Sequence, residues 1–319
     1  MSESSPRVVT VLGAGTVGAS LASVYAAAGC TVRIVDSDDR CLRRVETLAA
    51  RVVRITASNQ TPSDLMARME RHRELESACR NTEFVSESLP ENLDLKRASL
   101  EQLEEYVGPR VIIATSTSSL LVSDLQRGLR HPERVVAAHP FNPPHLVPLI
   151  EVAGGKDTAD WALNWTMRFY RALGRVPIRL KREAIGHLAN RLTAALYREA
   201  VDLVASGVAS VADVDAAVRY GPGLRWAVMG PHMTYHLAGG EGGYAAYLEH
   251  LGPAQERRWA SLRTPQLTPE VKLALVEGVA AEAESLGIGE LEARRDAALI
   301  AILQTLRTME PLGADPRES

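Results

Sequence analysis

Short apolar runs alternate with segments of helical period along the first 180 residues of the chain. Short runs of β-branched and apolar residues are typical of buried strands, and apolar positions three and four apart are typical of helices. Their alternation is typical of βαβ units, so we predict an α/β fold with a doubly wound parallel sheet. The predicted strands are residues 7–13, 31–36, 82–87, 110–115, 134–139, 147–152 and 175–180, and the predicted helices are 16–29, 38–58 and 62–79.

After Lys181 the pattern becomes helical. We predict that residues 1–184 form the sheet domain and that residues 185–319 form a smaller all-helical domain. Ser210 and Thr268 directly precede helical patterns and are suitable N-cap residues, because their side-chain oxygens can accept hydrogen bonds from the first turn. The apolar faces of this domain are extensive, which predicts a homodimer formed through it. The predicted helices are residues 186–207, 210–221, 269–287 and 290–309, and the tail 311–319 is predicted to be disordered.

The composition is that of a globular protein without a basic surface. Hydrophobic residues make up 46% of the 319 residues, charged residues make up 24%, and the formal net charge is −3. This balance argues against a nucleic-acid partner, so we expect a small-molecule substrate. No apolar segment is long enough to span a membrane and the N-terminus has no signal-peptide pattern, which predicts a cytoplasmic protein. The three cysteines, Cys30, Cys41 and Cys79, have neither metal nor disulfide spacing and are predicted to be isolated thiols.

The stretch "VLGAGTVGAS" has three glycines in GxGxxG spacing between a predicted strand and a predicted helix. Gly13 permits the tight turn, Gly15 lets the backbone approach a pyrophosphate, and Gly18 allows close packing of helix and strand. The predicted helix begins at Thr16, and the free N–H groups of its first residues, which include Thr16 and Val17, can bind the phosphates. The sequence therefore predicts a Rossmann-type dinucleotide-binding domain.

Asp36 ends the next predicted strand. A carboxylate at this position accepts both ribose hydroxyls of NAD and repels the 2′-phosphate of NADP, so we predict NAD as the cofactor. Arg40, Arg43 and Arg44 lie nearby and are suited to a 2′-phosphate, which leaves NADP as the alternative. The glycines could also be ordinary turn residues, but the complete order of strand, loop, helix, strand and acid favours the cofactor site.

Two polar residues, His139 and Glu151, lie twelve residues apart in "VVAAHPFNPPHLVPLIEVAGG", each near the end of an apolar run. Ser118 follows another predicted strand, and Asn190 lies at the start of the helical region. Each has a plain structural explanation if taken alone: a strand-end histidine, a helix-capping serine or a polar helix residue. As a set they suggest an acid–base site.

Together these motifs resemble the 3-hydroxyacyl-CoA dehydrogenase family. The glycine loop, "PENLDLKR", "TSTSSL", "HPFNPP", "LIEV" and "GHLANRL" occur in the family's order and at about its spacing, and the resemblance covers nearly the whole chain. The resemblance implies the catalytic residues Ser118, His139, Glu151 and Asn190, and implies that Glu91, Lys96 and Asn142 contact the nicotinamide end of the cofactor.

The chemistry of these residues suits hydride transfer between a secondary alcohol and NAD. A histidine, with an ordinary pKa of about 6.5, can accept or supply the hydroxyl proton near neutral pH. Glu151 is expected to bind the far ring nitrogen of His139 and to stabilise the imidazolium. Ser118 and Asn190 are expected to donate hydrogen bonds to the substrate oxygen. Because Asn190 falls in the predicted helical domain, we expect the site in the interdomain cleft.

The substrate is less well defined. Family members that act on acyl-CoA often carry "HFFNP" and a phenylalanine after the glycine of "GHLANRL", where this chain has Pro140 and His187. Residues 221–243 are similar to the branch that contains carnitine dehydrogenase and gulonate 3-dehydrogenase (lambda-crystallin), which implies a short polar 3-hydroxy acid as substrate. Alternatives are a ketoreductase acting on a polyketide intermediate, a 3-hydroxyacyl-CoA dehydrogenase and a non-catalytic, crystallin-like NAD-binding protein.

Arg225 and Trp226 are the candidate substrate-binding residues. Arg225 can pair with a substrate carboxylate, and a structural ion pair is the alternative. Trp226 and the tyrosines Tyr235, Tyr244 and Tyr247 can surround a trimethylammonium group, and packing in the helical core or a dimer interface is the alternative. Three histidines, His187, His232 and His236, lack metal-ligand spacing, so we predict no metal.

Overall fold

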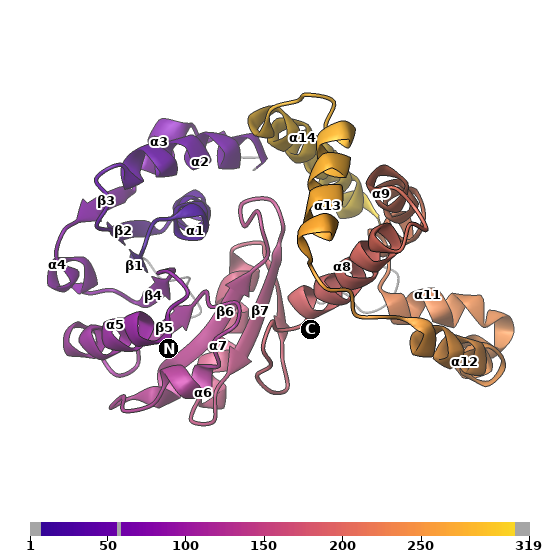
Figure 1. Cartoon of the computed structure of the whole chain (residues 1–319). Coiled ribbons are helices and arrows are strands. Elements are labelled where there is room, and N and C mark those ends of the chain that lie inside the picture. The colour runs from indigo at the N-terminus through magenta and orange to yellow at the C-terminus, as the bar shows by residue number, and fades with distance from the viewer. Residues whose placement is uncertain (1–7, 56–58, 310–319) are drawn as a thin grey trace. The chain divides into compact units, whose positions relative to one another are not determined.

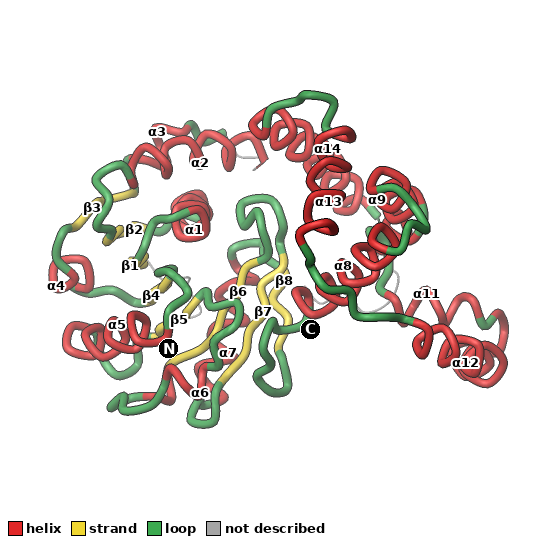
Figure 2. Tube along the Cα trace, in the orientation of Figure 1, coloured by secondary structure: helices red, strands yellow, loops and turns green. Residues whose placement is uncertain are grey.

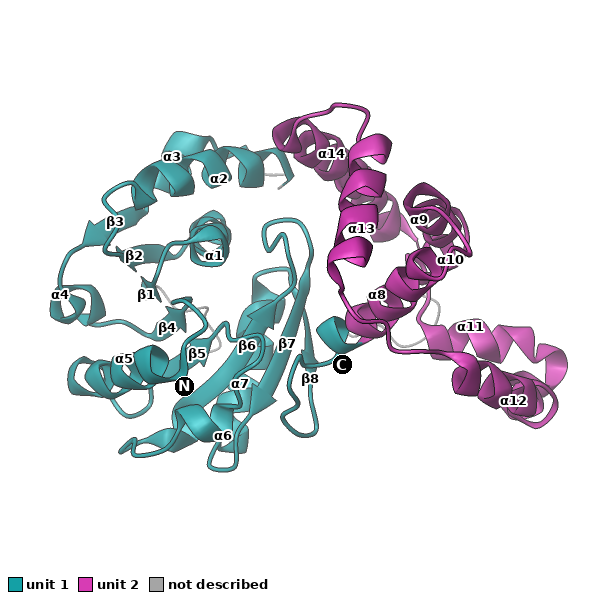
Figure 3. Ribbon diagram, viewed as in Figure 1, with its two compact units in different colours: residues 1–191, 316–319 teal, residues 192–315 magenta. Residues whose placement is uncertain are grey.

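The structure is a computed structural model and describes residues 8–55 and 59–309. It divides into two compact units, with the division between Arg191 and Leu192 (Figure 3). Unit 1 contains the described chain up to Arg191, and unit 2 contains the described chain from Leu192 onward. The tail that we predict to be disordered lies outside the described residues.

Unit 1 is built around an eight-stranded sheet with the order β3-β2-β1-β4-β5-β6-β7-β8 (Figures 1 and 2). Neighbouring strands are parallel except β6 and β7, which are antiparallel. The strand order reverses between β1 and β4, and in open α/β sheets ligands bind at this point, outside the carboxyl ends of the strands. The strands are β1 (Val8–Leu12), β2 (Thr31–Val35), β3 (Met69–His72), β4 (Phe84–Glu87), β5 (Ile112–Thr115), β6 (Val135–Pro140), β7 (Leu149–Gly154) and β8 (Val176–Arg179).

Helices cover both faces of the sheet. Apolar residues of α1, α2 and α7 pack with one face, and apolar residues of α4, α5 and α6 pack with the other. In β4, Phe84 belongs to the first cluster and Val85 to the second, because successive side chains of a strand point to opposite faces. The helices of unit 1 are α1 (Thr16–Ala27), α2 (Cys41–Ile55), α3 (Pro62–Met66), α4 (Leu75–Cys79), α5 (Leu93–Tyr106), α6 (Val122–Leu125), the short 3-10 helix η1 (Pro132–Arg134) and α7 (Asp160–Ala172).

The seven predicted strands are confirmed, with differences of a few residues at their ends. The single helix predicted at 62–79 is wrong, because α3, β3 and α4 occupy this segment. The β3 sequence, MERH, lacks the alternation that marks a strand. It is extended because it pairs in parallel with β2, where Glu70 lies 3.7 Å from Arg33. All three cysteines are buried and free, as expected for isolated thiols.

Unit 2 is helical, as predicted. Ser210 Oγ accepts a hydrogen bond from the N–H of Asp213 at 3.1 Å, and Thr268 Oγ1 accepts one from Val271 at 3.4 Å, so both predicted N-caps are confirmed. Over residues 8–55 and 59–309, no helix is both long and apolar enough for a membrane span. The helices are α8 (Ala189–Ala205), which begins in unit 1, α9 (Val211–Tyr220), α10 (Pro222–Trp226), α11 (Pro231–Ala238), the 3-10 helix η2 (Gly240–Gly242), α12 (Gly243–Ser261), α13 (Pro269–Glu282) and α14 (Ile288–Thr308).

Candidate active site

The glycine loop joins β1 to α1, and its three glycines meet three different needs. Gly13 has φ +86°, and a Cβ there would lie 2.7 Å from the carbonyl oxygen of Ser88. A Cβ on Gly18 would lie 1.9 Å from the carbonyl oxygen of Gly13, so helix and loop touch through backbone. A Cβ on Gly15 would meet nothing within 4 Å of the described chain, so this side of the loop is open to a ligand.

The start of α1 and the end of β2 fit a dinucleotide. Gly15 is the N-cap of α1 and makes no side-chain capping bond, so the first N–H groups and the positive end of the helix dipole can hold phosphates. The Asp36 carboxylate directly follows β2 and accepts hydrogen bonds from the N–H groups of Ala14 at 2.5 Å and Asp38 at 2.7 Å. Each carboxylate oxygen has a second acceptor site, so Asp36 can also accept ribose hydroxyls.

Two of the three arginines near Asp36 are engaged by Asp38. Arg44 Nη1 lies 2.8 Å from Asp38 Oδ2, and Arg44 Nε donates to the carbonyl oxygen of Ala14 at 3.0 Å. Arg40 Nε lies 3.1 Å from Asp38 Oδ1. Hydrogen bonds from Arg40 and then Arg44 hold the pKa of Asp38 well below its usual range. Asp38 therefore pairs with two of the guanidinium groups that a 2′-phosphate could otherwise attract.

His139 and Glu151 face each other across the antiparallel pair of β6 and β7. His139 Nδ1 lies 2.9 Å from Glu151 Oε2, and both side chains are buried. The other carboxylate oxygen of Glu151 accepts hydrogen bonds from the N–H groups of Leu188 at 2.7 Å and Ala189 at 2.9 Å. The start of α8 thus binds the carboxylate that orients the histidine.

These hydrogen bonds determine the protonation of the pair. Burial acts to raise the pKa of Glu151, but the hydrogen bonds from His139, Ala189 and Leu188 outweigh it and the pKa lies below its ordinary value. An ionised carboxylate can only accept, so Nδ1 of His139 carries the proton shared with Glu151. The lone pair of Nε2 is then available for acid–base chemistry.

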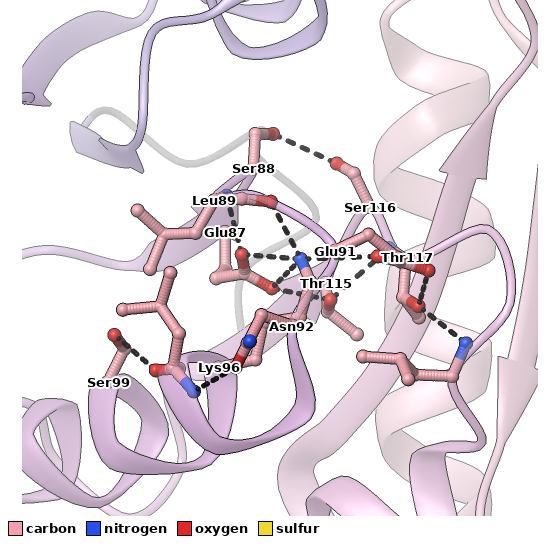
Figure 4. Close-up of polar contacts among 12 residues, drawn as sticks. Glu87, Ser88, Leu89, Glu91, Asn92, Lys96, Ser99, Thr115, Ser116 and Thr117 are labelled. Atoms are coloured by element: carbon pink, nitrogen blue, oxygen red, sulfur yellow. Dashed lines mark hydrogen bonds and ion pairs between the residues drawn. The ribbon is translucent and has the colours of Figure 1, made fainter.

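Glu91 organises the loop that follows β5. Its Oε1 accepts a hydrogen bond from Thr117 Oγ1 at 2.7 Å (Figure 4). The same oxygen accepts hydrogen bonds from the N–H groups of Ser118 at 2.9 Å and Ser119 at 2.8 Å. Partial burial acts to raise the pKa of Glu91, but the hydrogen bonds from Thr117 and Ser119 and the charge of Lys96 outweigh it, and the pKa lies below its ordinary value. Glu91 therefore holds the backbone around Ser118 in place.

Lys96 lies in a buried polar cluster behind this loop. Its Nζ is 2.8 Å from Glu87 Oε1, donates to the carbonyl oxygen of Leu89 at 3.1 Å, and lies 3.8 Å from Glu91 Oε2 (Figure 4). Thr115 Oγ1 also donates to Glu87. Sequence reasoning missed Glu87 as a partner of Lys96, although it ends a predicted strand just before "PENLDLKR". Removal of one charge from such a buried pair leaves the other uncompensated.

The remaining predicted residues are less directly connected. Ser118 is half-buried in the loop after β5, Asn190 is half-buried in the first turn of α8, and Asn142 is exposed after β6. Both Ser118 and Asn190 belong to unit 1, with His139 and Glu151. Within the described residues, no hydrogen bond joins the side chain of Ser118 or Asn190 to His139. Their catalytic roles and a site between the two domains stay predictions.

Sequence reasoning also missed the position of His187 beside His139. The two rings stack with centroids 4.9 Å apart and an interplanar angle of 26°. His187 Nε2 lies 2.9 Å from the carbonyl oxygen of Thr117, next to Ser118. The contact joins residues 48 positions apart in the chain, and no local pattern marks it.

The candidate substrate residues Arg225 and Trp226 lie in α10 and are exposed. Among the residues that the structure describes, Arg225 has no ion-pair partner within 4.0 Å, and its role in substrate binding stays a prediction. In unit 2 the rings of Tyr235 and Tyr247 stack at 4.6 Å, and His232 Nδ1 lies 3.1 Å from the Tyr244 hydroxyl. Across residues 8–55 and 59–309 no cluster of His, Cys, Asp or Glu side chains is placed to hold a metal ion.

A doubly wound sheet with an open glycine loop at its first strand and a buried His–Glu pair near its strand ends defines an NAD-dependent dehydrogenase. The model of the 3-hydroxyacyl-CoA dehydrogenase NAD-binding domain matches residues 8–184, and the model of that family's C-terminal domain matches residues 186–273. The chain belongs to the 3-hydroxyacyl-CoA dehydrogenase family. It is an NAD-dependent oxidoreductase that interconverts 3-hydroxy and 3-keto groups.

Curated relatives and solved structures resemble the chain over nearly its whole length. The L-carnitine dehydrogenase of Streptomyces coelicolor is 41% identical over 309 residues, which is 96% of each chain. The L-carnitine dehydrogenase of Bacillus cereus is 39% identical over 98% of this chain and 96% of its own. The crystal structure of 5-formyl-3-hydroxy-2-methylpyridine 4-carboxylic acid 5-dehydrogenase, an NAD+ dependent dismutase, has a TM-score of 0.79 and 26% identity, and the match covers 95% of this chain and 99% of that one.

Proposed function

We propose that this enzyme is an L-carnitine dehydrogenase. The observation that carries the proposal is the 41% identity to the Streptomyces coelicolor enzyme of that name over 96% of both chains. The exposed Arg225 supports it, since a guanidinium can bind the carboxylate of carnitine in a bidentate way. Trp226, Tyr235 and Tyr244 are at least partly exposed and can offer aromatic faces to its trimethylammonium group. Tyr247, in contrast, is buried and stacks on both tyrosines.

His139 is the general base in the direction of alcohol oxidation. Its Nε2 takes the proton of the C3 hydroxyl, while Glu151 holds Nδ1–H and stabilises the imidazolium. Ser118 and Asn190 donate hydrogen bonds to the oxygen as it gains negative charge. Bound NAD+ supplies the chemistry of hydride acceptance, and the same groups return the proton when the keto group is reduced.

The residues that hold the cofactor follow from the glycine loop and from the Glu91 network. Asp36 would accept the ribose hydroxyls, and Glu91 would contact the nicotinamide end. Lys96 is predicted to contact the same end, but its side chain is buried against Glu87 and Glu91, so we propose that it acts by supporting Glu91. Asn142 lies exposed after β6 and binds the same end. The phosphates lie against the loop residues Gly13, Gly15, Thr16, Val17 and Gly18.

A substrate comparison tests the assignment. NADH formation is followed with L-carnitine, 3-hydroxybutyrate, L-gulonate and 3-hydroxybutyryl-CoA, and NADH consumption is followed with a β-dicarbonyl compound. We expect kcat/KM for L-carnitine to exceed that for 3-hydroxybutyrate by about 100-fold, because 3-hydroxybutyrate lacks the trimethylammonium group. Arg225→Gln is expected to raise KM for L-carnitine. Faster turnover of the CoA thioester would disprove the substrate assignment and leave the dehydrogenase class intact.

The contacts of Asp36 and Asp38 predict cofactor selectivity. We expect the wild-type protein to bind NADH at least about 10-fold more tightly than NADPH. The double variant Asp36→Ser/Asp38→Asn is expected to tighten NADPH binding by about 10-fold or more, because it removes the repelling carboxylate and releases Arg40 and Arg44. Dissociation constants from protein fluorescence measure the effect. Asp39→Asn, which alters the exposed partner of Arg71, is the control, and equal NADPH affinity in all three proteins would contradict the prediction.

We propose that the enzyme is a cytoplasmic homodimer formed through unit 2. Taken by itself, unit 2 exposes large apolar side chains on several helices, and such patches usually mark protein interfaces. Leu273→Glu/Val276→Glu is expected to yield a monomer, while Leu95→Glu at an exposed position of α5 is expected to keep the dimer. Light scattering measures the mass, and a monomeric wild-type protein would exclude the dimer. The exposed apolar residues include Leu192, Leu196, Tyr197, Tyr220, Leu224, Leu273, Val276, Val279 and Ile302.

A further inference from the structure

We propose that His187 is a positioning residue that holds the His139 ring against Glu151, ties it to the Thr117–Ser118 loop, and stays neutral while His139 exchanges protons. The proposal rests on the proposed acid–base role of His139. It concerns a residue whose place in the site follows from contacts in unit 1 alone.

The stacking contact restricts the His139 ring. The ring centroids are 4.9 Å apart, the planes are inclined by 26°, and the two side chains are almost completely buried. One edge of the His139 ring is bound by Glu151 at 2.9 Å, and one face is covered by His187. Rotation about the Cβ–Cγ bond of His139 would break the first contact and clash with the second.

One short segment holds both members of the pair. His187 covers His139, and the next two N–H groups, those of Leu188 and Ala189, bind Glu151 at 2.7 and 2.9 Å. His187 has φ +49°, a left-handed conformation that is uncommon for a residue other than glycine. Such a conformation persists where surrounding contacts over-determine it, and these contacts do so at His187.

The hydrogen bond of His187 connects the pair to the serine loop. Nε2 lies 2.9 Å from the carbonyl oxygen of Thr117, and because a carbonyl only accepts, Nε2 carries the proton. Thr117 in turn donates to Glu91 at 2.7 Å, and Glu91 accepts from the N–H of Ser118 at 2.9 Å. His187 therefore links the loop of Ser118, the predicted substrate-binding serine, to His139, the predicted base, through direct contacts.

The surroundings of His187 favour its neutral form. Nδ1 is buried and, within the described residues, has no hydrogen-bond partner, so a second proton there would gain no acceptor. Burial lowers the pKa of His187, the Thr117 carbonyl opposes this, and His139 lowers it further, while the carboxylates of Glu151 and Glu91 act to raise it. A neutral ring is what His139 needs, since a cation stacked on it would oppose formation of the imidazolium.

Two substitutions separate the ring from its hydrogen bond. His187→Phe keeps an aromatic face against His139 and loses the bond to Thr117, whereas His187→Gln keeps a donor and loses the face. We expect His187→Gln to lower kcat by about 10- to 100-fold and His187→Phe to restore part of this loss, with the Kd for NADH within about twofold of wild type in both. His72→Phe, which alters a histidine on edge strand β3, is the control and is expected to keep kcat.

Histidine-selective ¹⁵N NMR gives a readout that needs no substrate. In the wild-type protein we expect His187 to be the neutral Nε2–H tautomer between about pH 7 and 8, and His139, when neutral, to be a single Nδ1–H tautomer. His187→Gln is expected to mix the tautomers of His139, and His187→Phe is expected to preserve the single form. Titration of His187 in this range, or an unchanged His139 signal together with unchanged kcat in His187→Gln, would overturn the proposal. Failure of L-carnitine as substrate would leave these NMR results unaffected and would count only against the proposed function.

Discussion

His139→Gln is expected to lower kcat by about 10³-fold while leaving the Kd for NADH within about twofold of wild type. Glutamine occupies a similar volume and can still meet Glu151, but it has no group that takes up and returns a proton near neutral pH. His139 lies near the C-terminal end of β6, and the glycine loop that we predict to hold the cofactor phosphates lies in a separate segment between β1 and α1. The substitution is therefore expected to lower kcat without weakening NADH binding.

Steady-state kinetics and NADH fluorescence titration measure the two quantities. His131→Gln is a matched control, because His131 is a partly exposed histidine 3.4 Å from Glu133 and is expected to tolerate the same replacement. Retention of more than about a tenth of wild-type kcat in His139→Gln would exclude His139 as the acid–base residue. If NADH affinity fell together with kcat, the substitution would have disturbed the fold, and the loss of kcat could not be assigned to the missing acid–base group.

Glu151→Gln is expected to lower kcat by about 10³-fold through the tautomer of His139. The amide oxygen can still accept from Leu188 and Ala189, and its NH₂ group then faces Nδ1 of His139. A donor in this position favours the histidine tautomer that carries its proton on Nε2. That nitrogen can no longer accept the substrate proton, although substrate and cofactor still bind, so kcat is expected to fall more than KM changes.

The same substitution has a pH-dependent effect on stability. Because the pKa of Glu151 is lower in the folded than in the unfolded chain, its ionised form stabilises the fold above the ordinary value of 4.5. This contribution is lost as the pH falls through the lower, folded pKa. Urea unfolding of wild type and Glu151→Gln should therefore give free energies that differ most near neutral pH and converge in acid. The exposed Glu46→Gln is the control, and a difference that grows in acid would contradict the prediction.

The cofactor loop and most of the fold were predictable because their signals are local. The strand, turn and helix patterns around Gly13 and Asp36 lie within one βαβ unit. Each is set by steric limits on neighbouring residues or by the spacing of apolar residues along the chain. The N-caps Ser210 and Thr268 are local in the same sense, since each accepts from an N–H three residues further on. The structure confirms the predicted strands, the turn and the helix around the glycine loop, and it confirms both N-caps.

The charged segment 69–72 shows where local pattern failed. The residues of this segment have a high intrinsic propensity for helix. They nevertheless form an edge strand, because their backbone hydrogen bonds come from β2, which is distant in sequence. The pairing of Glu87 with Lys96 has a related origin. A buried charge is stable only with a partner, and the loop between β4 and α5 supplies that partner by bringing the last residue of β4 to the first turn of α5.

The sequence by itself thus determined the sheet class, the glycine loop between β1 and α1, the acid after β2 and the residue types of the candidate acid–base pair. Only the tertiary structure decided that His139 and Glu151 stand opposite each other, because the antiparallel register of β6 and β7 sets that contact. It also placed His187 on His139 and the N–H groups of Leu188 and Ala189 on Glu151. The physical reason is that periodicity encodes which face a residue occupies, whereas contacts between distant segments depend on how the whole chain packs.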